Sequence, residues 1–252
     1  MRRMSPSKVF KTYLWVEMLS LFVLVPGVFA MIVHPDRAFA GLFEAVGVGW
    51  VNGIPSPVRL LMPALLIFTI WITAWLLLDP SFKKRQLWDW PAAKKELPRI
   101  IGVFLPGAAV MLGFGWLLAS YTGVMTVGDG SAFLRLPREM PMAVVMILIF
   151  YPWFSAYPQE ITHRAFFFHR YRRILPGRWS MIWVNAAVFA WLHAPFWHWM
   201  ALAITLPGGV LFAWTYDRSR STLAAGLEHG LYGWWAFVVG LGWFVFTGSI
   251  GS

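Results

Sequence analysis

The chain has 252 residues, of which 59% are hydrophobic and only 13% are charged, and its mean hydropathy is +0.62. A soluble globular protein would be far more polar, so the composition indicates a polytopic helical membrane protein. The absence of cysteine excludes disulfides, thiolate metal sites and a cysteine nucleophile. The net charge of +10 is attributed to cytoplasmic loops that face anionic lipid of the bilayer, so no nucleic-acid partner is expected.

Seven apolar segments, each about 20 residues long, are predicted to be transmembrane helices, and an eighth span or a re-entrant piece stays open. They cover residues 12–33, 58–78, 100–120, 141–162, 180–197, 199–216 and 221–246. The fourth is expected to continue to Arg173, because Pro176-Gly177 is the first strong helix stop after it. We therefore predict an all-α membrane protein, a polytopic bundle of about seven to eight transmembrane helices that forms one membrane-embedded domain over residues 1–252.

The basic residues are distributed unequally between the loops. When the loops alternate from an inner amino terminus, 17 of the 21 lysines and arginines fall on the inner side. The four exceptions are Arg37, Arg59, Arg135 and Arg138. This asymmetry predicts a multi-pass protein of the cell (inner) membrane with a cytoplasmic amino terminus.

Ionisable side chains inside apolar segments are costly and usually mark functional sites. Glu160, His193 and His229 lie on three predicted helices, about 14 to 22 Å from the inner basic clusters at ~1.5 Å of rise per residue. A simpler interpretation makes each histidine a hydrogen-bond partner between helices. In the same interpretation, Glu160 forms an ion pair with Arg164, which lies four residues later on the same helix face. Three ionisable groups at one depth favour a buried polar site that water reaches from the cytoplasmic side.

Such a trio suits hydrolysis in two ways. A Zn²⁺ ion held by His193, His229 and Glu160, with water as the fourth ligand, would match the ligand set of catalytic zinc sites. Alternatively, Glu160 acts as general base on a water that one histidine positions, while the other histidine polarises the scissile carbonyl. His163 is a weaker candidate ligand three residues after Glu160. Glu228 is expected to pair with a neighbouring helix rather than to act as a second base.

The same residues lie in motifs that resemble those of the CPBP family, the CAAX prenyl protease and Abi (bacteriocin-processing) type of intramembrane metalloprotease. That family has the signatures Glu-Glu-x-x-x-Arg, Phe-x-x-x-His and His-x-x-x-Asn. Residues 159–164 match the first signature except at Gln159, and residues 189–193 match the second in full. His229 begins the third, in which Gly233 takes the asparagine position. The resemblance covers residues 141–246 and implies a catalytic core there.

The resemblance implies an endopeptidase that cleaves a membrane-associated protein or peptide, including lipidated ones. The site residues it implies are Glu160, His193, His229, Gln159 and Arg164. The family's first glutamate is usually assigned to activate water, and a glutamine cannot take a proton. Either Glu160 takes that role while Gln159 donates a hydrogen bond, or the chain is a non-catalytic scaffold or chaperone that binds a partner helix or lipidated tail. A transporter is a third interpretation, although no inverted repeat supports it.

Overall fold

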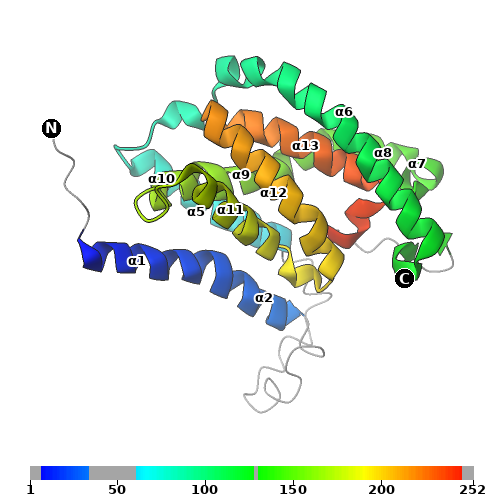
Figure 1. Cartoon of the computed structure of the whole chain (residues 1–252), viewed down its shortest axis with the longest axis horizontal. Helices are drawn as coiled ribbons and strands as arrows, with labels where there is room; N and C mark the ends of the chain where they lie inside the picture. Colours follow the sequence, from blue (N-terminus) through cyan, green and yellow to red (C-terminus); the bar gives the residue numbers. More distant parts are fainter. Residues whose placement is uncertain (1–6, 34–60, 128–129, 246–252) are drawn as a thin grey trace, which may run out of the picture.

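The computed structural model describes residues 7–33, 61–127 and 130–245, and helices make up nearly all of them (Figure 1). The α-helices are α1 (Lys8–Leu19), α2 (Val25–Val33), α5 (Leu61–Leu78), α6 (Trp90–Tyr121), α7 (Arg135–Glu139), α8 (Pro141–Tyr151), α9 (Tyr157–Glu160), α10 (Phe167–Tyr171), α11 (Arg178–Trp191), α12 (Trp199–Ser219) and α13 (Thr222–Val239). The described strands, β1 (Thr126–Val127) and β2 (Gly130–Ser131), form one short antiparallel ladder. The predicted class, an all-α membrane protein, is confirmed.

Five helical stretches in the described ranges are long and apolar enough to span a membrane. They are Lys8–Ile32, Leu61–Leu78, Lys84–Tyr121, Pro141–Tyr171 and Trp199–Ser219. The predicted fifth and seventh segments correspond to α11 and α13, which are not in this group. The fifth is shorter than expected, because α11 has 14 residues and ends at Trp191, before Pro195. The seventh ends at Val239, where Gly240 caps α13 in a left-handed conformation (φ 89°).

The predicted fourth segment is one continuous helical stretch, Pro141–Tyr171, which ends two residues before the expected Arg173. Two π-helical turns interrupt it, Pro152–Ala156 and Ile161–Phe166, one on each side of the four-residue α9. Proline has no N–H to donate, so Pro152 favours a departure from the α-helical hydrogen-bond pattern. Single π turns inside α-helices occur frequently at functional sites.

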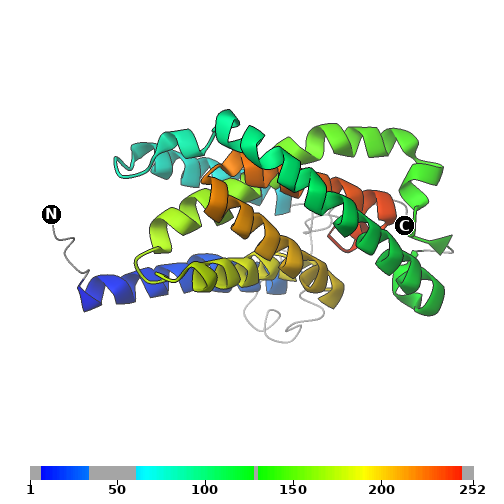
Figure 2. The ribbon, with the colours of Figure 1, turned by 45° about the horizontal axis from the view of Figure 1, so that its top comes forward.

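Helix α13 lies in the middle of the bundle, where it contacts α6, α8, α9 and α12 (Figures 1 and 2). Helix α11 packs along α12, and α5 contacts α9 and the π turn that follows it. The outer faces of α5 and α6 expose large apolar side chains such as Ile67, Ile70 and Val110, each about 70% exposed. These faces fit a lipid environment, in which apolar surface carries no hydrophobic penalty.

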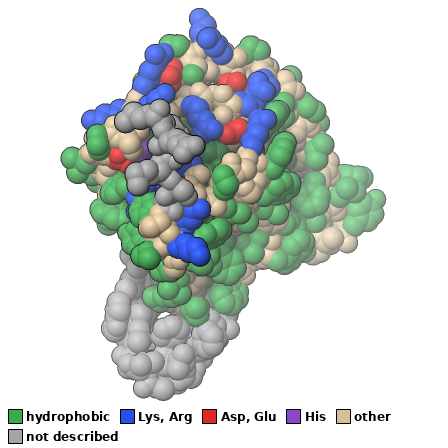
Figure 3. All heavy atoms as spheres, turned by 60° about the vertical axis from the view of Figure 1, so that its left-hand side comes forward, with side chains coloured by type: hydrophobic (Ala, Val, Ile, Leu, Met, Phe, Trp, Pro, Cys, Tyr) green, Lys and Arg blue, Asp and Glu red, His purple; other side chains and the backbone are tan. Residues whose placement is uncertain are grey.

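The predicted separation of charge is visible in the structure. The amino end of α1, the α5–α6 connection, the α10–α11 turn and the α12–α13 turn lie at one end of the molecule, where lysines and arginines gather (Figure 3). Helix α7, with Arg135 and Arg138, lies at the other end (Figure 1). Arg164 differs from the other basic residues assigned to the inner side, because it is fully buried. Arg2, Arg3, Arg37 and Arg59 lie outside the described residues.

Candidate active site

The three ionisable residues predicted to share one depth lie on helices that meet in the middle of the bundle. Glu160 is the last residue of α9, His229 lies in α13, and His193 follows the end of α11. His229 Nδ1 lies 2.9 Å from Glu160 Oε1. The Phe189 ring lies beside both imidazoles, with centroid distances of 5.2 Å to His193 and 5.5 Å to His229. The structure therefore brings the predicted trio into one buried region, with direct contact between Glu160 and His229.

The hydrogen bonds of His229 determine which of its nitrogens carries the proton. An ionised carboxylate only accepts hydrogen bonds, so the Nδ1–H of His229 donates to Glu160 Oε1. In the neutral imidazole Nε2 is then an acceptor, and the Tyr151 hydroxyl, 3.1 Å away, donates to it. Glu160 thus fixes both the orientation and the tautomer of His229.

Arg164 balances the negative charge of Glu160. Its Nε lies 3.1 Å from Glu160 Oε2, and both side chains are completely buried. The predicted pairing of these two residues, four positions apart, is therefore present in the structure. The guanidinium also donates to the Gly209 carbonyl at 3.4 Å and lies 4.6 Å from the centroid of the Phe189 ring. An arginine that contacts an aromatic face and a backbone carbonyl is held in place beside the carboxylate.

His193 is oriented by the carbonyl of Phe189 in α11, the helix that precedes it. Its Nδ1 lies 3.0 Å from the Phe189 carbonyl, which can only accept, so Nδ1 carries the proton and Nε2 the lone pair. Among the described residues there is no hydrogen bond from His193 to Glu160 or His229. His193 is 8% exposed and lies between the buried polar groups and the cavities described next.

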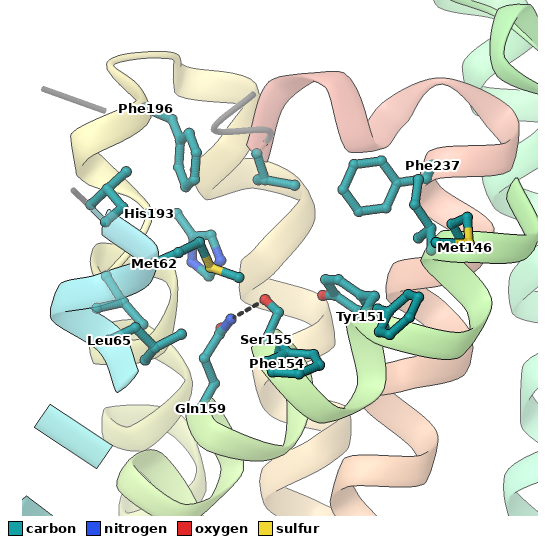
Figure 4. A pocket seen from close by; sticks show the side chains of 15 residues that line it. Met62, Leu65, Met146, Tyr151, Phe154, Ser155, Gln159, His193, Phe196 and Phe237 are labelled. Atoms are coloured by element: carbon teal, nitrogen blue, oxygen red, sulfur yellow. Dashed lines mark hydrogen bonds between the residues drawn. The ribbon is translucent and has the colours of Figure 1, made fainter. Parts of the chain in front are cut away.

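Two apolar cavities meet near these groups. One has a volume of about 370 Å³ and lies between α5 and α8. The residues that define this α5–α8 cavity include Met62, Leu65, Met146, Phe154 and Phe196 (Figure 4). The other, about 380 Å³, lies between α6 and α12 and is lined by residues such as Val110, Phe114, Ile204 and Leu211. His193 and Tyr151 line both cavities, and His229 lines the α6–α12 cavity.

Gln159 supplies polar groups to the wall of the α5–α8 cavity. Its amide Nε2 donates to Ser155 Oγ at 3.0 Å, one turn earlier, and the two side chains lie beside the cavity with His193 above them (Figure 4). Gln159 Oε1 has no hydrogen-bond partner in the described part of the chain. An unpaired buried carbonyl oxygen costs free energy, which a bound water or a substrate N–H would recover.

The proposed metal ligands do not form one ligand set in this structure. Within the described ranges, no group of three histidine, aspartate or glutamate side chains is placed to hold a metal ion. His229 directs Nδ1 to Glu160 and Nε2 to Tyr151, while Glu160 also faces Arg164. Binding Zn²⁺ through Glu160, His193 and His229 would require these contacts to be exchanged. The zinc hypothesis stays a prediction, and this arrangement does not support it.

Two further sequence candidates lie apart from the pair of Glu160 and His229. His163 contacts the Gln159 carbonyl through Nδ1 and packs edge-on against the Phe22 and Phe189 rings. Glu228 accepts a hydrogen bond from Thr215 and lies 3.4 Å from Arg99 of α6. The expectation that Glu228 pairs with neighbouring helices is confirmed.

The sequence interpretation missed Tyr151, Ser155 and the aromatic side chains around the histidines. Phe212 stacks on His229 at a centroid distance of 4.6 Å, and Phe189 contacts His163, His193 and His229. Phe189 was available as the first residue of a recognised motif. The proline after Tyr151 was the only signal that the helix changes its hydrogen-bond pattern there.

Together these features define a class of protein: a helical membrane protein with a buried carboxylate–imidazole pair beside apolar cavities. Residues 141–235 match a family model described as Rce1-like, type II CAAX prenyl endopeptidase. This match supports the resemblance to the CPBP family that the three motifs predicted, a family of intramembrane peptidases. No match was found among curated proteins or among solved structures.

Proposed function

We propose that this protein is an intramembrane endopeptidase that hydrolyses a peptide bond in a membrane-associated or lipidated protein. The observation that carries the proposal is the buried, hydrogen-bonded pair of Glu160 and His229, of which His229 lines the apolar α6–α12 cavity. Ionisable groups inside a membrane domain are costly to bury and are retained mainly where they do chemistry.

The α5–α8 cavity suits an apolar segment or lipid group of the substrate. Its wall is apolar except for a few polar side chains at one end, among them Ser155, Gln159 and His193. Sites of this kind bind a ligand by its apolar surface and orient it with a few polar groups. In this proposal the scissile carbonyl lies against that polar end.

His229 is the proton acceptor in this proposal, because its proton on Nδ1 leaves Nε2 basic. Water loses a proton to the imidazole while its oxygen bonds to the carbonyl carbon, and the imidazolium returns that proton to the amine as the C–N bond breaks. Glu160 stabilises the imidazolium, as the carboxylate does in hydrolase triads. Gln159 donates to the carbonyl oxygen as negative charge develops on it. Glu160 lies between Arg164 and His229, so in this proposal it acts through His229.

The proposal is tested with purified protein in lipid vesicles. The probe is an internally quenched peptide with an S-farnesyl cysteine near its carboxyl terminus, beside the same peptide without the lipid. Wild-type protein is expected to cleave the lipidated peptide, and His193→Ala is expected to lower kcat/KM by about 10²-fold or more. His198→Ala is the control, because His198 stacks on Phe244, accepts from the Met200 N–H and lines neither of the two cavities. Equal cleavage by His193→Ala and wild type would contradict the placement of the scissile carbonyl at the polar end of the cavity, which His193 lines.

A non-catalytic scaffold or chaperone is the second candidate function. Gln159 favours it, because this side chain cannot accept a proton where the family's motif has a glutamate. A scaffold would bind the same partner helix or lipidated tail in the α5–α8 cavity without cleaving it. In a complementation assay, full function after alanine replacement of Glu160, His193 and His229 together would select the scaffold.

The orientation is also part of the proposal, with the basic end in the cytoplasm of a cell with an inner membrane. The chain has no cysteine, so single cysteines can report the orientation directly. Lys84→Cys at the basic end is expected to react with a membrane-impermeant maleimide only after permeabilisation. Tyr121→Cys, at the other end of α6, is expected to react in intact cells, since Tyr121 is 75% exposed. Ile72→Cys, which is fully buried, controls for folding, and the reverse pattern would overturn the orientation.

A further inference from the structure

Tyr151 lies between the candidate base and the space in which substrate and water would bind. It is the last residue of α8, and the π turn Pro152–Ala156 begins directly after it. Its hydroxyl lies 3.1 Å from His229 Nε2, and the two rings are 6.0 Å apart at an angle of 75°. Tyr151 also lines both the α5–α8 cavity and the α6–α12 cavity. The basic nitrogen of His229 is therefore directed at a hydroxyl group rather than at an open cavity.

Gly233 makes this contact sterically feasible. It lies four residues after His229 on α13, so the two positions share a helix face. A Cβ atom at position 233 would overlap the ring and hydroxyl of Tyr151. The Tyr151 ring thus occupies the space that a side chain at position 233 would need. Two helices therefore shape the environment of His229. Helix α8 contributes the Tyr151 hydroxyl, and α13 contributes Gly233, which leaves room for the Tyr151 ring.

The direction of the hydrogen bonds gives this arrangement a function. Glu160 accepts from Nδ1, so the Tyr151 O–H donates to Nε2. Ser155 is a second hydrogen-bond partner of the Tyr151 hydroxyl, and the phenol oxygen keeps one lone pair for a further donor. A water molecule in either cavity could donate to that oxygen. The chain from water through Tyr151 and His229 to Glu160 would then be continuous.

We propose that Tyr151 is a catalytic residue that relays a proton between the attacking water and His229. As the water oxygen bonds to the carbonyl carbon, a water proton moves to the Tyr151 oxygen and the tyrosine proton moves to His229 Nε2. The reverse transfer delivers one proton to the amine nitrogen when the C–N bond breaks. The products are a carboxylic acid and an amine, and the enzyme returns to its starting protonation. This inference rests on the proposed peptidase function.

Tyr151→Phe is the first test, because it removes the hydroxyl and keeps the ring beside Gly233. We expect kcat for the lipidated peptide to fall about 10²-fold or more with little change in KM. Tyr216→Phe is the matched control, since it also removes a buried hydroxyl, which donates to Gln86 at 3.0 Å at the basic end. Gly233→Ala is expected to reproduce the loss, because its methyl group would displace the Tyr151 ring.

A second measurement separates proton relay from simple positioning of His229. Trifluorotyrosine incorporated at position 151 keeps the shape of the side chain but has a more acidic phenol. A relay predicts that the pH profile of kcat shifts to lower pH, whereas a residue that only orients His229 would leave it unchanged. If wild-type protein cleaves no peptide, the proposed function fails. If wild type cleaves but Tyr151→Phe keeps its kcat, or the fluorinated protein keeps the wild-type pH profile, the relay alone is overturned.

Discussion

Glu160→Gln is expected to lower kcat for peptide hydrolysis by about 10³- to 10⁴-fold, the loss typical when a carboxylate that orients a catalytic histidine becomes an amide. The amide has nearly the same shape but no negative charge. It can present an N–H to His229 Nδ1, which would move the imidazole proton to Nε2 and remove the basic lone pair. Rates are measured with the quenched lipidated peptide, and the thermal transition in detergent verifies that the variant is folded.

Glu17→Gln provides a matched control for that substitution. Glu17 also lies in an apolar helix and pairs with an arginine, Arg170, at 2.7 Å. That pair is at the basic end, so this variant is expected to keep kcat even if it melts earlier. A wild-type rate for Glu160→Gln would overturn the role given to Glu160.

Arg164→Leu is expected to destabilise the protein by about 3–5 kcal/mol, the range found when one partner of a buried ion pair is removed. The reason is that Glu160 would remain as a buried carboxylate with no opposite charge beside it. The double variant Glu160→Gln/Arg164→Leu removes both charges and is expected to be more stable than Arg164→Leu alone. Thermal unfolding in one detergent compares the variants.

Arg178→Leu is the control for Arg164→Leu, because Arg178 is 49% exposed in its pair with Asp217. Exposed ion pairs contribute about 0–1 kcal/mol, so only a small change in melting temperature is expected. If the double variant is less stable than the single Arg164→Leu variant, the charge of Glu160 is not what Arg164 compensates.

The sequence was sufficient to predict that Glu160 pairs with Arg164 and that Glu160 and His229 lie at one depth, although it did not predict contact between Glu160 and His229. The rise per residue of a helix placed Glu160 and His229 at one depth. The four-residue spacing between Glu160 and Arg164 predicted that these two side chains pair. The structure contains both contacts. These predictions succeeded because each depends on the position of a residue along its helix, which the sequence defines directly.

The environment of the site could not be predicted in the same way. Tyr151 reaches His229 because α8 and α13 are adjacent, and helical periodicity does not predict which helices are neighbours. The replacement of asparagine by Gly233 was visible in the sequence only as a departure from a motif. The structural reason for a glycine at position 233 is the Tyr151 ring, which fills the space beside it. That ring belongs to a different helix, so the sequence motif does not reveal it.

Phe189 has a consequence for how substitutions in this site combine. Its ring contacts three imidazoles and the guanidinium of Arg164, while only 1% of the residue is exposed. Groups that share a packing partner in this way do not respond independently, because a shift of the shared ring moves all of them. The effects of substitutions at His193 and His229 should therefore fail to add, although no hydrogen bond joins the two residues in the described part of the chain. Variation at one of these positions would constrain which residues are tolerated at the other.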